Sequence, residues 1–275
     1  MSSAHAEVSL VVSIKPLQLI AASILGDEGT VRVLVPVSDS PHHYTMTPSD
    51  RVALDSADLV VYVGEQLETE LHEVLNKLAE DQRVLELILL PGLTRRQVTG
   101  SDSLDPHIWL DSRNGLQIAA ALRDALTEID GRRARQWADN YTALEQRLLA
   151  DEARWRGRLQ TVPDTAYGVY HDAIGYFEAR FERRHSVVLV EDPETQPGIR
   201  QMLQVRRLID EQQPVCLFTD ITSRQTTIDT LFAGHTVQQV QLDLLGDRLG
   251  AGGSYSQLLD NLVSDFSRCL NGEMD

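Results

Sequence analysis

The chain has 275 residues, a length that suits one large or two medium domains. Its 42% hydrophobic and 24% charged residues are typical of a globular protein and exclude a disordered chain, and no run of about 18 apolar residues predicts a membrane-spanning helix. The formal net charge is -16 and no cluster of Lys and Arg stands out, which excludes a nucleic-acid binder, because phosphate recognition needs concentrated positive charge.

The first half of the chain alternates strand-like apolar runs with helix-like segments. Pro48-Ser49-Asp50 indicates a helix start, with Ser49 or Asp50 available as a cap. Such alternation predicts a parallel sheet covered by helices. Strands are expected at residues 8–14, 30–35, 58–63 and 83–89, and helices at residues 17–25, 51–56 and 67–78.

A long helix is expected in the middle of the chain. A polar loop, residues 94–104, and a helix, residues 114–129, precede it. Residues 132–159 then carry apolar side chains at helical spacing, with neither Gly nor Pro before Gly157. At 1.5 Å per residue this helix reaches about 40 Å, long enough to connect two lobes rigidly.

The second half repeats the alternation of strands and helices. Its strands are expected at residues 166–170, 186–190, 215–218 and 237–242, and its helices at residues 172–181, 198–212, 223–232 and 255–270. We therefore predict an α/β protein of two Rossmann-like lobes with parallel sheets, joined by one long helix. The expected division is an N-terminal lobe at residues 7–130, the linking helix at 131–160 and a C-terminal lobe at 161–275.

Three histidines and one aspartate stand out by their positions. His42 and His171 each follow a predicted strand, Asp243 follows the last strand, and His107 lies in a loop. Ligands of open α/β sheets bind beyond the carboxyl ends of the strands, so these side chains are candidates for one site between the lobes. Their wide separation excludes a zinc finger or a local helical metal motif. His43 is adjacent to His42 and is expected to face solvent. His72, His185 and His235 have no partner at metal-ligand spacing and are expected to be structural or exposed.

Three histidines with a bound water would also suit a zinc hydrolase or lyase. Such an enzyme requires an open coordination position and a positioned general base. The sequence contains no His-Glu-x-x-His or comparable catalytic motif, and a fourth protein ligand would close the site. We therefore expect a binding protein and not an enzyme.

Six parts of the chain form a recognisable series. They are Ser13-Ile14-Lys15-Pro16, Ser40-Pro41-His42-His43-Tyr44 with Pro48-Ser49-Asp50, Ala57-Asp58-Leu59-Val60-Val61-Tyr62-Val63-Gly64, Asp105-Pro106-His107-Ile108-Trp109-Leu110-Asp111, His171-Asp172-Ala173-Ile174-Gly175-Tyr176-Phe177 and Leu242-Asp243-Leu244-Leu245-Gly246. In this order, from near residue 8 to near residue 270, they resemble the metal-specific solute-binding proteins of ABC transporters, in particular the zinc group typified by ZnuA and AztC.

The resemblance implies two α/β lobes bridged by a long helix, in agreement with the pattern above. It identifies His42, His107 and His171 as ligands of Zn²⁺, which is the transported cargo, and Asp243 as the usual fourth ligand. It implies a monomeric periplasmic carrier that delivers zinc to the membrane permease of an ABC transporter. Three neutral imidazoles suit zinc, whereas manganese prefers oxygen donors, and manganese binders of this family carry Glu at the position of His171. The alternatives are a carrier of manganese or another divalent metal, and a zinc-dependent adhesin.

The chain departs from the family pattern at residues near the expected site. Some zinc members carry Glu before the first histidine, but Pro41 stands there in this chain, so Asp243 or a water must be the fourth ligand. Asp243 is favoured, and the alternative is that it caps the next segment or accepts a hydrogen bond from a ligand imidazole. The loop at residues 94–104 lacks the histidines common in zinc members, which leaves delivery of zinc by a metallochaperone open.

Two features bear on export. Ala4-His5-Ala6 has the small-x-small pattern of a signal-peptidase site without a hydrophobic segment before it, which indicates the remainder of a trimmed export signal, with an arbitrary leader as the alternative. Cys216 and Cys269 would be able to pair in an oxidising compartment and then stabilise the fold by roughly 4 kcal/mol, or they would remain two buried thiols. They also resemble a disulfide in the C-terminal lobe of some family members.

Overall fold

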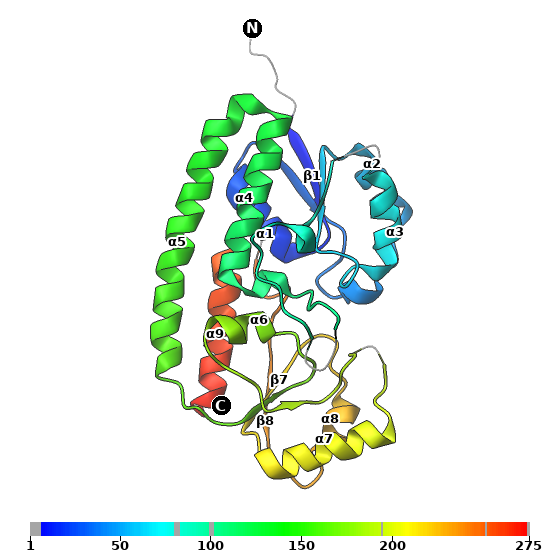
Figure 1. Ribbon diagram of the computed structural model, residues 1–275, viewed down its shortest axis with the longest axis vertical. Helices are drawn as coiled ribbons and strands as arrows, with labels where there is room; N and C mark the ends of the chain where they lie inside the picture. The colour runs from blue at the N-terminus through cyan, green and yellow to red at the C-terminus, as the bar shows by residue number, and fades with distance from the viewer. Residues whose placement is uncertain (1–6, 80–82, 99–101, 194, 251, 274–275) are drawn as a thin grey trace.

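The computed structural model describes residues 7–79, 83–98, 102–193, 195–250 and 252–273. The pattern Ala4-His5-Ala6 lies outside these ranges. Two parallel sheets with flanking helices lie one above the other in Figure 1, and one long helix, α5 (Ala134–Gln160), runs along one side of the molecule past both sheets. No helix within the described ranges has the length and apolar character needed to cross a membrane.

The first lobe is built on a four-stranded parallel sheet in the order β2-β1-β3-β4. The two central strands are apolar along nearly their whole length because helices cover both faces of a parallel sheet. The strands are β1 (Val8–Val12), β2 (Gly29–Val33), β3 (Leu59–Tyr62) and β4 (Val84–Glu86), and the helices are α1 (Lys15–Leu25), α2 (Pro48–Ser56) and α3 (Thr69–Leu78).

The second lobe repeats this plan, with a four-stranded parallel sheet in the order β6-β5-β7-β8. In Figure 1 α7 and α8 lie below this sheet, on the side far from the first lobe. The strands are β5 (Tyr167–Val169), β6 (Val187–Val188), β7 (Cys216–Thr219) and β8 (Gln238–Gln241), and the shorter helices are α6 (Gly175–Arg180), α7 (Ile199–Gln212) and α8 (Gln225–Leu231).

Three long helices hold the two lobes together, namely α4 (Ser112–Ile129), α5 (Ala134–Gln160) and the C-terminal α9 (Tyr255–Leu270). One continuous cluster of buried apolar side chains extends from the first sheet through these helices to β5 and β7. The helix α9 packs against α5 and also contacts α1. Because the lobes share one core, a wide hinge motion would expose apolar surface to water at a cost in free energy.

The structure confirms the predicted fold class of two parallel α/β lobes and one long helix. The helix α4 begins two residues earlier than expected because the Asp111 carboxylate accepts a hydrogen bond from the Arg113 amide at 2.7 Å and caps the helix. The segment expected as a strand at residues 186–190 forms only the two residues of β6. A disulfide joins Cys216 of β7 to Cys269 of α9, as predicted. The division at residues 7–130, 131–160 and 161–275 stays a prediction.

Candidate metal centre

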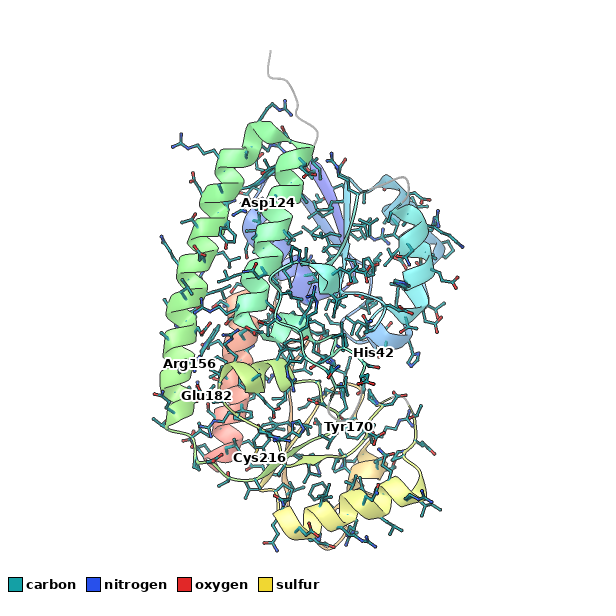
Figure 2. All side chains as sticks on the ribbon, in the orientation of Figure 1. His42, Asp124, Arg156, Tyr170, Glu182 and Cys216 are labelled. Carbon is teal, nitrogen blue, oxygen red and sulfur yellow. A yellow bond between two sulfur atoms is a disulfide. The ribbon has the colours of Figure 1, made fainter. Side chains whose placement is uncertain are left out.

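Three connecting segments bring His42, His107 and His171 to the boundary between the lobes. His42 belongs to a one-turn 3-10 helix, Pro41–His43, in the connection from β2 to α2. His107 directly precedes a second such turn, Ile108–Leu110, and His171 lies just beyond β5. Figure 2 shows His42 between the upper and lower lobes, on the side of the molecule away from α5.

The loop that carries His42 is anchored by Asp50 in the first turn of α2. Thr47 caps this helix, and the Asp50 carboxylate accepts a hydrogen bond back from the Thr47 amide at 2.9 Å. The same carboxylate accepts hydrogen bonds from the Tyr44 hydroxyl at 2.8 Å and from Nη2 of Arg32 at 3.0 Å. Burial opposes ionisation, but these bonds hold the pKa of Asp50 below its usual value. The network fixes the chain on both sides of the turn that holds His42.

The spacing of the three imidazole rings is near that of ligands on one ion. The ring centroids of His42 and His107 are 5.9 Å apart, and those of His107 and His171 are 5.4 Å apart. Two imidazoles at tetrahedral positions around zinc, with Zn–N near 2.0–2.1 Å, have centroids roughly 5 Å apart. In the described structure the donor nitrogens of the three rings are not all within 4.8 Å of one another, so the rings must move slightly inward to share an ion.

His171 is oriented by a carboxylate from the neighbouring strand. Its Nδ1 atom lies 2.8 Å from Oδ2 of Asp220, which directly follows β7. Burial alone would lower the pKa of His171, but the charge of Asp220 has the larger effect, and the pKa of His171 is raised. Burial also opposes the ionisation of Asp220, but the neighbouring imidazole lowers the pKa of Asp220 to about 2. The Nε2 atom of His171 is buried and has no hydrogen-bond partner among the described residues. This arrangement leaves Nε2 as the donor available to a metal.

His107 has the same kind of support. Its Nδ1 atom lies 2.8 Å from Oδ1 of the fully buried Asp105, and its backbone amide donates to the same oxygen at 3.0 Å. The other oxygen of Asp105 accepts a hydrogen bond from Nη1 of Arg96 at 3.0 Å. Trp109 packs beside the imidazole, with ring centroids 5.4 Å apart. The carboxylate holds the ring so that Nε2 is free to bind an ion.

His42 differs from the other two rings in its electrostatic surroundings. Burial, and next the neighbouring imidazoles of His107 and His171, lower the pKa of His42 to about 3. A metal ligand must be the neutral imidazole, so His42 stays in the binding form across the physiological pH range.

Asp243 borders the same cavity as the three histidines. Its Oδ1 atom accepts hydrogen bonds from the amides of Gly246 at 2.6 Å and Asp247 at 2.7 Å, and its Oδ2 atom accepts one from the Arg248 amide at 2.8 Å. The carboxylate therefore caps the following loop. Each carboxylate oxygen has two lone pairs, so Oδ2 retains acceptor capacity for a metal. Nζ of Lys15 donates to the Gly246 carbonyl at 2.6 Å and so ties this loop to the first lobe.

Two cavities meet at the three imidazoles. The smaller one, about 40 Å³, is walled mainly by apolar side chains that include Trp109, Leu242 and Leu244. The larger one, about 550 Å³, extends from the imidazoles past α3 to Glu191 and Asp192. The site is therefore narrow and apolar on one side and wide and polar on the other.

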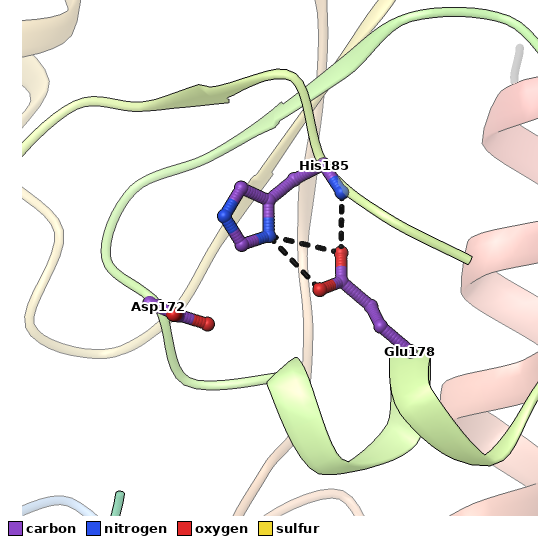
Figure 3. Close-up of side chains that lie close together, drawn as sticks. All are labelled: Asp172, Glu178 and His185. Atoms are coloured by element: carbon purple, nitrogen blue, oxygen red, sulfur yellow. Dashed lines mark hydrogen bonds and ion pairs between the residues drawn. The ribbon is translucent and has the colours of Figure 1, made fainter. Parts of the chain in front are cut away.

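A second group of metal-binding residue types lies nearby, at Asp172, Glu178 and His185, whose donor atoms are within 4.8 Å of one another (Figure 3). Here the Glu178 carboxylate already accepts bonds from Nδ1 of His185 at 2.9 Å and from the Tyr167 hydroxyl at 2.6 Å. Burial opposes the positive charge of His185, but Glu178 raises the pKa of His185. The ion pair of Glu178 and His185 joins α6 to the segment before β6, and the Tyr167 hydroxyl joins it to β5. Among the described residues three further histidines remain. His43 is exposed, His72 lies 2.8 Å from an Asn76 amide, and His235 lies 2.7 Å from Asp210.

Sequence reasoning placed the three imidazoles but gave no role to the carboxylates behind them. Asp220 follows β7 directly, at the same sheet edge as His171, so its position at a strand end was a usable signal. Asp105 stands two residues before His107, within the motif Asp105-Pro106-His107. Its role depends on a buried side-chain contact that spacing along the chain does not reveal.

A family profile matches residues 10–269, and its description is the periplasmic component A of the zinc-uptake complex, ZnuA. This chain belongs to that family. It is 30% identical over 293 residues to the high-affinity zinc uptake system protein ZnuA of Yersinia pestis, covering 96% of this chain and 92% of the relative. The protein of the same name from Haemophilus ducreyi is also 30% identical, covering 96% of this chain and 94% of the relative. The family is one of transport proteins that bind their cargo, not of enzymes.

Solved structures confirm the fold of this ZnuA-family chain. A zinc-bound ZnuA deletion mutant superposes with a TM-score of 0.84 at 23% identity, covering 96% of this chain and 98% of that one. The periplasmic zinc-binding protein TroA from Treponema pallidum superposes with a TM-score of 0.86 at 23% identity, covering 96% and 99% of the two chains.

Proposed function

We propose that this chain binds Zn²⁺ with high affinity in the periplasm and delivers it to the permease of an ABC transporter. The proposed ligands are Nε2 of His107 and His171, a ring nitrogen of His42 and one oxygen of Asp243. The observation that carries the proposal is the convergence of three imidazoles, two of them backed by a buried carboxylate, at one cavity between the lobes.

The donor set favours zinc over manganese. Three imidazole nitrogens and one carboxylate oxygen make the four-coordinate site that Zn²⁺ prefers, whereas Mn²⁺ favours oxygen-rich sites of higher coordination number. The names of the relatives, which describe zinc uptake, support the same choice of metal and the partnership with a transport complex.

The assignment is tested by zinc titration calorimetry, with a competing chelator, on His42→Ala, His107→Ala and His171→Ala. Loss of a ligand should exceed the roughly 10- to 100-fold effect of losing a supporting residue, so we expect each variant to bind zinc more than about 100-fold more weakly. His43→Ala is the matched control, because His43 is adjacent to His42 but exposed. Unchanged affinity in all three variants would contradict the assignment.

The fourth ligand needs its own variant. Asp243→Asn removes the charge and keeps one oxygen, which can still accept from the Gly246 and Asp247 amides, but its amide nitrogen cannot accept from the Arg248 amide. We expect weaker zinc binding and a lower melting temperature of the metal-free protein. Zinc affinity equal to that of the unmodified chain would show that a water occupies the fourth position.

A further inference from the structure

The two cavities that meet at the imidazoles differ in what they can admit. A water molecule needs about 10–15 Å³ of cavity space, so the smaller cavity of about 40 Å³ has room for only a few waters. The larger cavity, at about 550 Å³, has room for a hydrated divalent ion. Exposed residues, among them His43 and Thr69, border the larger cavity, which therefore reaches the surface.

The wide cavity carries negative charge along its wall. Its described lining includes three carboxylates, those of Asp172, Glu191 and Asp192, and neither Lys nor Arg. Asp172 is buried, whereas Glu191 and Asp192 are exposed at the outer end, and we name these two the acidic rim. The acidic rim and the imidazoles of His42 and His171 border the same cavity. The charges of the rim therefore face the space that leads to the ligand group.

The inner end of the same cavity presents an available donor. His171 is more than nine-tenths buried and borders the cavity, and its Nε2 atom has no hydrogen-bond partner in the described part of the chain. A cation that crosses the cavity therefore passes from exposed carboxylates to a buried ring nitrogen that makes no hydrogen bond to the described residues. The cavity therefore has carboxylates at its outer end and a buried imidazole nitrogen at its inner end, whereas an ordinary acidic surface has only the carboxylates.

We propose that the wide cavity is the route by which hydrated Zn²⁺ reaches the site, and that Glu191 and Asp192 attract the ion into it and speed its capture. The inference rests on the proposed function, since it presumes that the imidazoles bind zinc. It assigns the rim to the rate of association and not to the coordination of the bound ion. In a cleft lined by one sign of charge, field focusing raises association rates, and salt weakens this effect.

The test measures zinc association by stopped flow, with Zn²⁺ alone as the ligand and tryptophan fluorescence as the signal, because Trp109 packs beside His107. The variant is Glu191→Gln/Asp192→Asn. We expect its association rate constant to fall about 3- to 10-fold at low ionic strength, and the deficit to shrink below about 2-fold near 0.5 M salt. Its dissociation rate constant should stay within about 2-fold of the unmodified chain.

A matched control removes the same charge far from the cavity. Glu128→Gln/Asp139→Asn changes two exposed carboxylates on α4 and α5. It should leave the association rate nearly unchanged. An equal decrease in both double variants would attribute the effect to net charge and overturn the proposal. So would an unchanged association rate in the rim variant, or a rise only in its dissociation rate.

This experiment separates the two proposals. If the three histidine variants lose zinc but the rim variant associates normally, the ligand assignment stands and the route fails. If the histidine variants keep full affinity, the ligand assignment fails whatever the rim variant shows.

Discussion

Oδ2 of Asp220 lies 2.8 Å from Nδ1 of His171, and the two residues come from neighbouring strand ends of the second sheet. The contact fixes which ring nitrogen of His171 faces the cavity. It also makes the imidazole more basic, since Asp220 raises the pKa of His171 against the opposing effect of burial. A more basic imidazole is a better zinc donor, so Asp220 supports binding without touching the ion.

The first prediction concerns this contact. Asp220→Asn should weaken zinc binding by roughly 10- to 100-fold at pH 8, less than the loss expected for His171→Ala, because the ligand stays but loses its orientation and basicity. Calorimetry with a competing chelator measures the difference. Asp139→Asn, at an exposed position on α5, is the control. An affinity within 2-fold of the unmodified chain would mean that Asp220 has no part in orienting the ligand.

An ion pair between the lobes joins Arg180 of α6 to Asp111, the cap of α4. Nε of Arg180 donates to Oδ1 of Asp111 at 2.9 Å and Nη2 donates to Oδ2 at 2.7 Å, which makes a bidentate ion pair. The Asp111 side chain is 4% exposed and the Arg180 side chain 24% exposed. The pair therefore ties the start of the long helices to the segment that follows His171.

Arg180→Gln should lower the free energy of unfolding by about 3 kcal/mol, because it leaves the Asp111 carboxylate buried without its partner. Urea denaturation of metal-free protein measures this. Asp111→Asn/Arg180→Gln should be less destabilised than the sum of the two single variants, since the uncompensated charge is gone. Arg51→Gln, which breaks the half-exposed pair with Asp55, should cost about 0.3–0.5 kcal/mol. Additive effects of the two single changes would show that the pair is uncoupled.

The order of strands and helices was predictable because each buried strand is a short apolar run between polar turns. The three imidazoles were predictable because His42 and His171 follow strands, and because the motif around His107 resembles a known family. The strand ends of a parallel sheet meet at one edge, so residues distant along the chain are brought together by topology alone.

Contacts between the two lobes were not predictable in the same way. The pairing of Asp111 with Arg180, and of Lys15 with the Gly246 carbonyl, depends on how two lobes pack, and no periodicity records it. The strand at residues 186–190 was expected to be longer than β6 because Leu189 and Val190, which follow β6, are buried apolar residues as well. The capping of the Asp243 loop had been considered as the alternative to coordination, and the structure shows the capping bonds.

Glu68 is a buried acid that sequence analysis passed over. It lies at the start of α3 with no exposed surface, and its carboxylate accepts hydrogen bonds from the amides of Val63 at 3.1 Å and Gly64 at 2.9 Å. Burial raises the pKa of Glu68 to about 7, although these amide bonds oppose the shift. The helix α3 packs on the turn that carries His42, so Glu68 belongs to the support of the site.

The last prediction follows from this pKa. Between about pH 4.5 and 7 the unfolded chain ionises Glu68 while the folded chain keeps the proton, so folding stability falls as pH rises, by at most about 1.4 kcal/mol per pH unit. Below this window both states hold the proton, and above it neither does. Glu68→Gln does not titrate, so its unfolding free energy relative to the unmodified chain should increase by roughly 2 kcal/mol between pH 5 and pH 7.5.

Urea denaturation at the two pH values tests this, with a chelator present because zinc binding is itself pH-dependent. Other groups titrate equally in both proteins and cancel in the difference. Glu73→Gln, an exposed change on the same helix, should give the same difference at both pH values. A constant difference for Glu68→Gln as well would mean that the carboxyl ionises normally in the folded chain, and that the amides of Val63 and Gly64 balance the effect of its burial.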